Sequence, residues 1–235
     1  MKRCALIAAC ILLASSLGRA GEVIDGIVAV VNRVAILQSD WDDAVRFEAL
    51  LQGRAPDTAN AAERRAALDR LIDRSLIQQQ LRAGRYPEAE APEVTVAIAA
   101  MRSQIAPGLA DDAWRARLAA YGLTAAGVET LIRRQVEQLG FVETRFRSAA
   151  HVGDAEIEQY YREEFLPQLR RAGGEARPLS EVRSRIEELL VEQRVNTLLA
   201  AWLQGLRSQA QIVMKDPALR GAPPGALASA GAPLD

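Results

Sequence analysis

The longest helical pattern in the sequence, over residues 181–208, constrains the fold more than any other feature. Ser180 precedes it as the expected N-cap. A helix of this length would extend roughly 42 Å, which is longer than a small globular core needs. Its apolar stripe has to be covered by other parts of the chain. The stripe consists of Val182, Ile186, Leu189, Leu190, Val195, Leu199, Trp202, Leu203 and Leu206.

Most of the remaining sequence also predicts helices. Ser39 is expected to cap the first of them, with Asp42 as its capping-box partner. Gly84 and Gly122 are expected to end the second and fourth, and Thr124 to cap the fifth. Pro167 and the segment 172–174 are expected to end the sixth. Apolar periodicity and these breaks predict helices over residues 40–51, 61–83, 92–106, 111–121, 125–148 and 154–166.

Short β-branched runs near the two ends of the chain predict strands. Ile27–Val31 and Val34–Leu37 flank Asn32 and Arg33, which favours a hairpin. Gln211–Met214 predicts a last short strand. The expected fold class is therefore mainly α, with a small N-terminal β-hairpin pairing with a short C-terminal strand.

Composition excludes several functional classes. The chain of 235 residues is 49% hydrophobic and 25% charged, which is typical of a folded protein. Its net charge of −1 argues against nucleic-acid binding. Its histidine, His151, and two cysteines, Cys4 and Cys10, are too few for a Cys/His zinc site. We predict no catalytic residue, metal or cofactor, and we interpret His151 as a surface residue rather than a general base.

Residues 1–20 have the three-part pattern of a secretory signal peptide. Lys2 and Arg3 precede the apolar run Cys4–Ala14, and the small residues Gly18 and Ala20 suit cleavage after Ala20. A membrane anchor is the alternative, but the run of 11 residues is short of the roughly 20 that span a bilayer. A lipid-modified Cys10 is a further alternative. Cleavage after Ala20 would remove both cysteines and change the net charge to −4.

Five segments, in this order behind the signal pattern, carry a resemblance to a known family. The segments are residues 23–32 continued at 36–40, residues 67–77, residues 121–124 running into 132–135, residues 152–161 and residues 182–212. Arg33 and Val34 depart from the small or acidic turn residues usual in that family. With them, the chain resembles the SurA-type periplasmic chaperones and, more loosely, the PrsA-like foldases. That family normally has parvulin-type prolyl isomerase domains between the last two segments. Only the 18 residues 162–179 stand there in this chain, too few for such a domain.

The resemblance implies a domain organisation and a function. It implies a chaperone domain over residues 21–214, in which residues 21–166 are joined by a returning helix and strand, 180–214. The Pro/Gly/Ala-rich composition of residues 215–235 predicts a disordered tail. The resemblance further implies a periplasmic, ATP-independent chaperone that binds unfolded polypeptides, chiefly outer-membrane protein precursors, without stable membrane insertion. Two alternatives stay open, a prolyl isomerase-type foldase and a non-chaperone interaction or scaffold protein.

Several residues are candidates for client binding, each with a structural alternative. The strand before Asn32 could accept a client strand by β-augmentation, or it could pair with the strand near Ile212, as the resemblance implies. Arg133 and Arg134 could bind an anion, although such pairs usually belong to a solvated helix face. Six larger side chains could grip a client or belong to the core: Met101, Trp114, Phe141, Phe146, Tyr160 and Tyr161.

Overall fold

The computed structural model of the chain describes residues 25–215. The predicted signal peptide, residues 1–20, and all of the predicted tail beyond Lys215 lie outside the described residues. The fold is mainly helical with a small antiparallel sheet, which confirms the predicted fold class. Its elements are β1 (Ile27–Val31), β2 (Val34–Leu37), α2 (Gln38–Leu51), α3 (Ala61–Ala83), α4 (Ala91–Ile105), α5 (Asp111–Ala120), α6 (Ala125–Phe146), η1 (Arg147–Ala149), α7 (Asp154–Tyr160), the π-helical turn η2 (Tyr161–Phe165), α8 (Leu166–Arg171), α9 (Leu179–Gln209) and β3 (Ile212–Met214).

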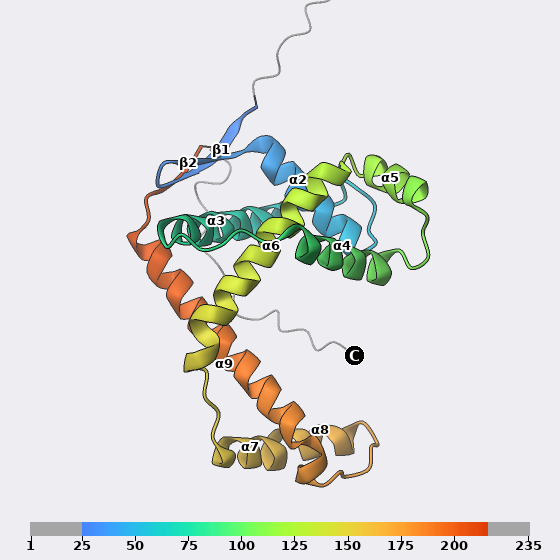
Figure 1. Cartoon of the computed structure of the whole chain (residues 1–235), viewed down its shortest axis with the longest axis vertical. Helices are drawn as coiled ribbons and strands as arrows, with labels where there is room; N and C mark the ends of the chain where they lie inside the picture. Colours follow the sequence, from blue (N-terminus) through green and yellow to red (C-terminus); the bar gives the residue numbers. More distant parts are fainter. Residues whose placement is uncertain (1–24, 216–235) are drawn as a thin grey trace, which may run out of the picture.

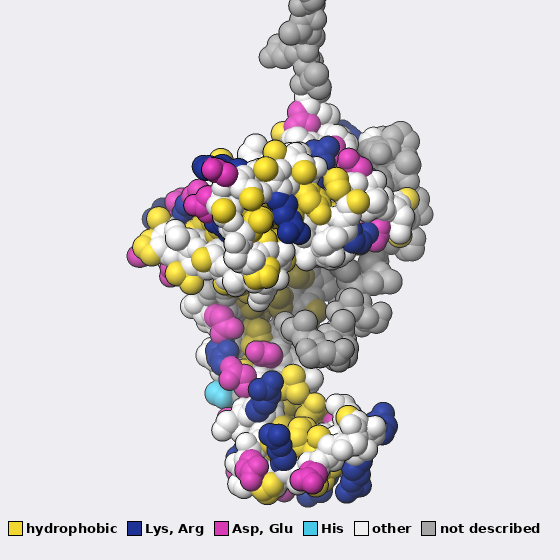
Figure 2. All heavy atoms as spheres, turned by 90° about the vertical axis from the view of Figure 1, so that its right-hand side faces the viewer, with side chains coloured by type: hydrophobic (Ala, Val, Ile, Leu, Met, Phe, Trp, Pro, Cys, Tyr) yellow, Lys and Arg dark blue, Asp and Glu magenta, His cyan; other side chains and the backbone are white. Residues whose placement is uncertain are grey.

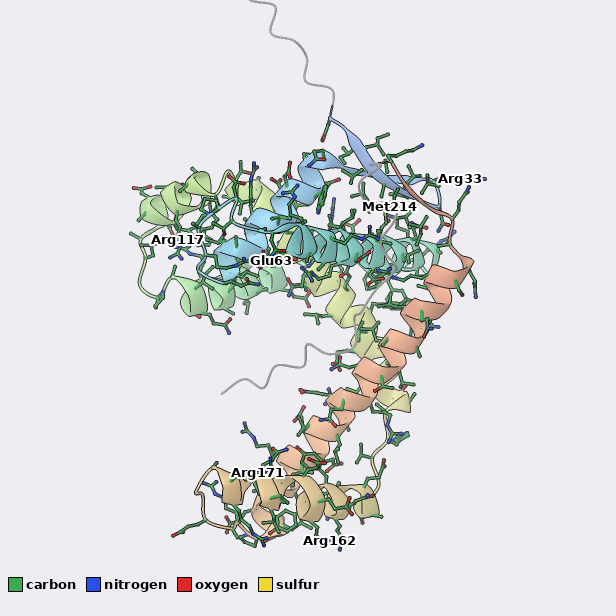
Figure 3. The ribbon with its side chains drawn as sticks, turned by 180° about the vertical axis from the view of Figure 1, so that it is seen from behind. Arg33, Glu63, Arg117, Arg162, Arg171 and Met214 are labelled. Atoms are coloured by element: carbon green, nitrogen blue, oxygen red, sulfur yellow. The ribbon has the colours of Figure 1, made fainter. Side chains whose placement is uncertain are left out.

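These elements form two lobes along α9 (Figure 1). The sheet, α2–α6 and the C-terminal half of α9 make the larger lobe, here called the body. Helices α7 and α8, the turn η2 and the start of α9 make the small lobe. From behind, Met214 lies near Arg33 at the sheet, whereas Arg162 and Arg171 lie in the small lobe at the far end of α9 (Figure 3).

The sheet joins the two ends of the described chain. Its strand order is β2-β1-β3, with antiparallel pairs on both sides of β1. The amide of Lys215 donates to the Val28 carbonyl, and the amide of Asn32 to the Gln211 carbonyl, both at 2.8 Å. Asn32 has a φ of 56°, which the tight hairpin requires and which asparagine tolerates. The predicted pairing of the N-terminal hairpin with the C-terminal strand is confirmed, so β1 is central rather than an open edge.

The apolar stripe of α9 is divided between the cores of the two lobes. In the body, Val195 is buried with Phe141 and Phe146 of α6. In the small lobe, Val182 and Ile186 are buried against Ile157 of α7. One long helix therefore supports two separate cores, and this explains its length. Helix α7, which falls within the predicted N-terminal part 21–166, packs in the small lobe rather than in the body.

Ion pairs hold α9 against α3. The Arg207 Nε lies 2.5 Å from Asp73 Oδ1, and its Nη2 donates to the Asp69 carbonyl at 2.9 Å. Asp69 is buried and also pairs with Arg65 at 3.4 Å. Burial opposes the charge of Arg207, but the hydrogen bond to Asp73 and the nearby carboxylates prevail and raise its pKa. These contacts fix the C-terminal helix, and with it β3, on the body.

Three predicted helix boundaries are wrong. Helix α2 begins after Leu37 rather than after Ser39, because the Ser39 amide and hydroxyl donate to the Asp25 carboxylate and are not available for a cap. Helix α9 begins after Pro178, without a cap from Ser180. Pro167 does not end its helix, because Phe165 and Leu166 keep helical dihedrals and the helical run continues from η2 through α8 to Arg171.

Asp42, the predicted capping partner of Ser39, instead joins α2 to α3. It accepts from Arg64 at 2.7 Å and from Gln38 at 3.1 Å. Burial would raise its pKa, but these hydrogen bonds outweigh burial and lower the pKa below 3.8. A lowered carboxyl pKa contributes stability above the unfolded-state value, and this stability is lost as the pH falls through the folded-state value.

Replacement of Asp42 by asparagine should therefore destabilise the protein in a pH-dependent way. We expect Asp42→Asn to lower the free energy of unfolding by about 1 kcal/mol at pH 7, because the pair with Arg64 is only partly buried. Thermal melts of both proteins at pH 7 and below pH 3.8 check this. The difference should shrink at the acidic pH, and an equal difference at both pH values would contradict the role of the charge.

Candidate functional site

A cavity of about 350 Å³ lies between β2, α2, α3 and α6, where α6 crosses α3 (Figure 1). We call it the β2 cavity. The side of α3 that lines it carries Leu71, Arg74, Ser75, Gln78, Gln79 and Arg82, and the side of α6 carries Gly127, Thr130, Leu131, Arg134, Gln135 and Gln138. Val34, Ala35 and Ile36 of β2 and Asp40, Asp43 and Phe47 of α2 complete its lining.

An unpaired strand edge borders this cavity. Val28 in β1 and Asn32 directly after that strand hydrogen-bond toward β3. By alternation along the strand, Val30 also points toward β3, whereas Ala29 and Val31 face β2. Val31 lies opposite Val34, and Ala29 lies opposite Ile36. By the alternation of antiparallel pairs, the backbone N–H and C=O of Ala35 then point away from β1. Within residues 25–215 no other strand pairs with this edge of β2.

The interior of the β2 cavity combines apolar and polar groups. Ile36 and Phe47 are buried, and Leu71 and Leu131 are half-buried. The Gln78 amide nitrogen donates to Glu137 at 3.4 Å, whereas its buried oxygen has no hydrogen-bond partner. Such a cavity can accept apolar side chains and, at its polar wall, amide or charged groups.

Burial changes the titration of two charged groups in the cavity. It lowers the pKa of the Arg74 guanidinium, which nonetheless stays charged at neutral pH. It also raises the pKa of Asp43, although Arg46 opposes this effect. The lowered pKa of Arg74 reflects partial removal of its guanidinium from water, whereas the Asp43 side chain is still 46% exposed.

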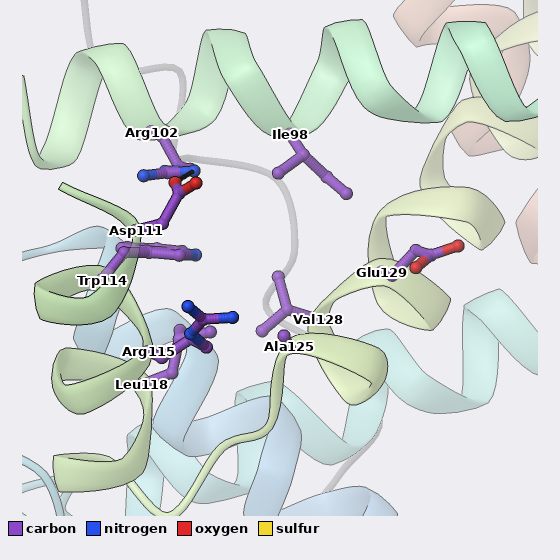
Figure 4. Close-up of a pocket in the computed structure, with 9 residues that line it drawn as sticks. All are labelled: Ile98, Arg102, Asp111, Trp114, Arg115, Leu118, Ala125, Val128 and Glu129. Carbon is purple, nitrogen blue, oxygen red and sulfur yellow. Dashed lines mark ion pairs between the residues drawn. The ribbon is translucent and has the colours of Figure 1, made fainter. Parts of the chain in front are cut away.

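A second hollow, of about 270 Å³, lies between α4, α5 and the start of α6 (Figure 4). Its charged groups already have partners. Arg102 pairs with Asp111 at 2.9 Å, donates to the Leu109 carbonyl and stacks over Trp114. Arg115 pairs with Asp112 at 2.5 Å. Because these cations are satisfied within the protein, this hollow is a weaker candidate for binding.

The six candidate aromatic and methionine side chains do not form one site. Met101 and Trp114 are buried in a core shared by α2, α4, α5 and α6. Phe141 and Phe146 are buried against α9. Tyr160 and Tyr161 are half-buried in the small lobe, where the Tyr161 hydroxyl donates to the Arg177 carbonyl at 2.5 Å. None of the six lines the β2 cavity, and Trp114 lines the second hollow.

The remaining candidates from the sequence, Arg133, Arg134 and His151, do not come together in one site either. Arg133 is engaged by Glu129 and by the Ala89 carbonyl, whereas its neighbour Arg134 lines the β2 cavity. His151 is exposed. Sequence reasoning missed the cavity residues of α3, although a signal exists: Arg74, Gln78 and Arg82 recur at helical spacing beside the apolar stripe.

No protein-family model matches this chain, and no curated protein matches it either. Within residues 25–215, no group of three or more His, Cys, Asp or Glu side chains is arranged to hold a metal ion. In that same part of the chain, no helix combines the length and apolarity needed to cross a membrane.

Proposed function

We propose that this chain is an ATP-independent periplasmic chaperone of the SurA type, which holds extended segments of unfolded polypeptides, chiefly outer-membrane protein precursors. The observation that carries the proposal is the open edge of β2 beside a cavity with an apolar interior. A strand added to such an edge binds through backbone groups that every polypeptide has. Binding of this kind is tolerant of client sequence.

The dimensions of the site suit weak and reversible binding. Strand β2 has four residues, and the amide of Leu37 is already engaged by Asp40 at 3.3 Å. Ala35 is then the only residue of β2 whose backbone N–H and C=O both point away from β1 and are free to pair with a client strand. Apolar side chains also gather over the body and the small lobe on one side of the molecule (Figure 2). A client held by such short contacts is released readily, as a chaperone without ATP requires.

The two rival functions make different demands on the chain. A parvulin-type isomerase needs a shaped pocket around the X-Pro bond, but residues 162–179 form only the rest of η2, helix α8 and the link to α9. A scaffold protein needs one fixed partner and would not protect unrelated clients. We therefore expect no acceleration of a proline-limited refolding reaction.

Light scattering tests the proposal directly. A urea-unfolded outer-membrane β-barrel protein is diluted into buffer without nucleotide, and we expect a molar equivalent of this chain to suppress its aggregation. Ala35→Pro removes the outward N–H at an edge position that tolerates proline, and it should abolish most of the suppression. Ala35→Val retains the N–H and should remain active.

Thermal melts must show that both Ala35 variants are folded. Equal suppression by Ala35→Pro and Ala35→Val would exclude pairing with β2 as the mode of binding. Failure of the unaltered chain to suppress aggregation of any unfolded client would exclude the chaperone function itself.

A further inference from the structure

Three arginines of the β2 cavity lack partners within the described chain. The guanidinium groups of Arg74, Arg82 and Arg134 make no hydrogen bond or ion pair with any residue from 25 to 215. Other arginines nearby are engaged: Arg64 pairs with Asp42 and Arg70 with Glu48. The three unpaired guanidinium groups come from two helices, α3 and α6, and line one space.

The acidic side chains near the cavity do not neutralise these arginines. The carboxylate of Asp40 accepts from the Leu37 amide, and that of Asp43 lies 3.9 Å from Arg46. Glu48 attracts Arg74 through its charge, but both of its oxygens are engaged by Arg70 at 2.9 and 2.5 Å. Three arginines and two carboxylates, those of Asp40 and Asp43, line the cavity, so its lining carries a net charge of +1 with the positive groups on the α3 and α6 walls.

The position of the arginines fits a ligand that enters from the rim. Arg82 and Arg134 are exposed, whereas Arg74 is half-buried deeper in the cavity. A guanidinium removed from water without a partner is unfavourable, and a carboxylate supplies the charge-assisted hydrogen bonds that it lacks. The buried oxygen of Gln78 is an acceptor without a donor, which a peptide N–H would satisfy.

We propose that the β2 cavity selects extended peptide segments that carry an acidic side chain, whose carboxylate is bound by Arg74, Arg82 and Arg134 while the peptide backbone pairs with β2. The inference rests on the proposed function, because it takes the ligand to be an extended polypeptide. It adds the specificity that backbone pairing alone does not provide.

Fluorescence anisotropy with capped peptides tests this specificity. Two labelled peptides of one length, acetylated and amidated at their ends, differ only in a central glutamate or glutamine. We expect the full chain to bind the glutamate peptide about tenfold more tightly, as charge-assisted hydrogen bonds to a partly desolvated group imply. In Arg74→Gln/Arg134→Gln the preference should fall to about twofold, because only the guanidinium of Arg82 then remains.

Control variants separate a local from a general charge effect. Arg185→Gln removes an exposed arginine of the small lobe and should retain the full preference. The single variant Arg134→Gln alters only an exposed rim residue, so it keeps the test valid if replacement of Arg74 prevents folding. It should reduce the preference by about twofold, since one of three guanidinium groups is lost.

The outcomes distinguish this inference from the proposed function. Equal binding of both capped peptides, lost in Ala35→Pro, would overturn the charge selection and leave β2 pairing intact. An undiminished tenfold preference in the double variant would also overturn it. A further outcome is that the two capped peptides bind equally while an uncapped glutamine peptide binds more tightly than either. In that case the arginines bind a terminal carboxylate, and the assignment to an acidic side chain is wrong. Binding of neither peptide would overturn both proposals.

Discussion

Truncation after Gly174 is expected to abolish cooperative thermal unfolding and to give an aggregating product. The truncated chain lacks α9 and β3, so Phe141 and Phe146 lose the side chains that cover them in the body. Strand β1 then has an open edge beside the exposed core, which favours pairing between molecules. Circular dichroism melts and sedimentation velocity measure both effects.

Truncation after Lys215 is the matched control. It retains every described element, and the residues it removes are rich in proline, glycine and alanine without a core-forming pattern. This shorter chain should melt cooperatively near the temperature of the full chain. A cooperative melt of the chain ending at Gly174 at that same temperature would show that α9 and β3 are not part of the body.

Replacement of Phe141 by alanine is expected to lower the free energy of unfolding by about 3–5 kcal/mol, the usual cost of removing a buried phenylalanine. The Phe141 side chain is 3% exposed, and its ring centroid lies 4.9 Å from that of Tyr86 and 5.4 Å from that of Trp202. The ring therefore connects three segments: the one after α3, α6 and α9. Urea titration followed by circular dichroism measures the loss.

Leu139→Ala is the control for this measurement, because Leu139 is 57% exposed on the same helix. Its replacement should change the free energy of unfolding by less than about 0.5 kcal/mol. The comparison also bears on client binding, for which Phe141 is one of the six sequence candidates. An unchanged stability combined with weaker client binding in Phe141→Ala would assign the ring to the client rather than to the core.

Local patterns predict the elements of this fold well where the separate signals agree. Helix α3 runs over Ala61–Ala83 as predicted, because an apolar stripe, the Asn60 cap and Gly84 agree. The hairpin strands also match, since β-branched runs flank a residue that tolerates a positive φ. The predictions fail where groups compete. Ser39 has the chemistry of a cap, but Asp25, fourteen residues earlier, binds its hydroxyl.

The candidate site is less predictable because it depends on how helices cross. Arg74 and Arg82 on α3 and Arg134 on α6 each resemble residues of a solvated face in the sequence. Only the crossing of α3 and α6 beside β2 places them around one cavity. The stripe of α9 similarly predicts a long buried face, but it does not indicate that two separate cores share it.

The pairing of β1 with β3 also has a consequence in time. It joins Asn32 to Gln211, which are 179 positions apart in the chain. At ribosomal rates, β3 is made about 10 to 40 s after β1. During that interval the hairpin has no partner on its β3 side, so a nascent chain exposes an acceptor edge that the finished protein has closed. The rate at which the chain reaches the compartment where it folds therefore sets how long each new molecule is open to strand exchange with its neighbours.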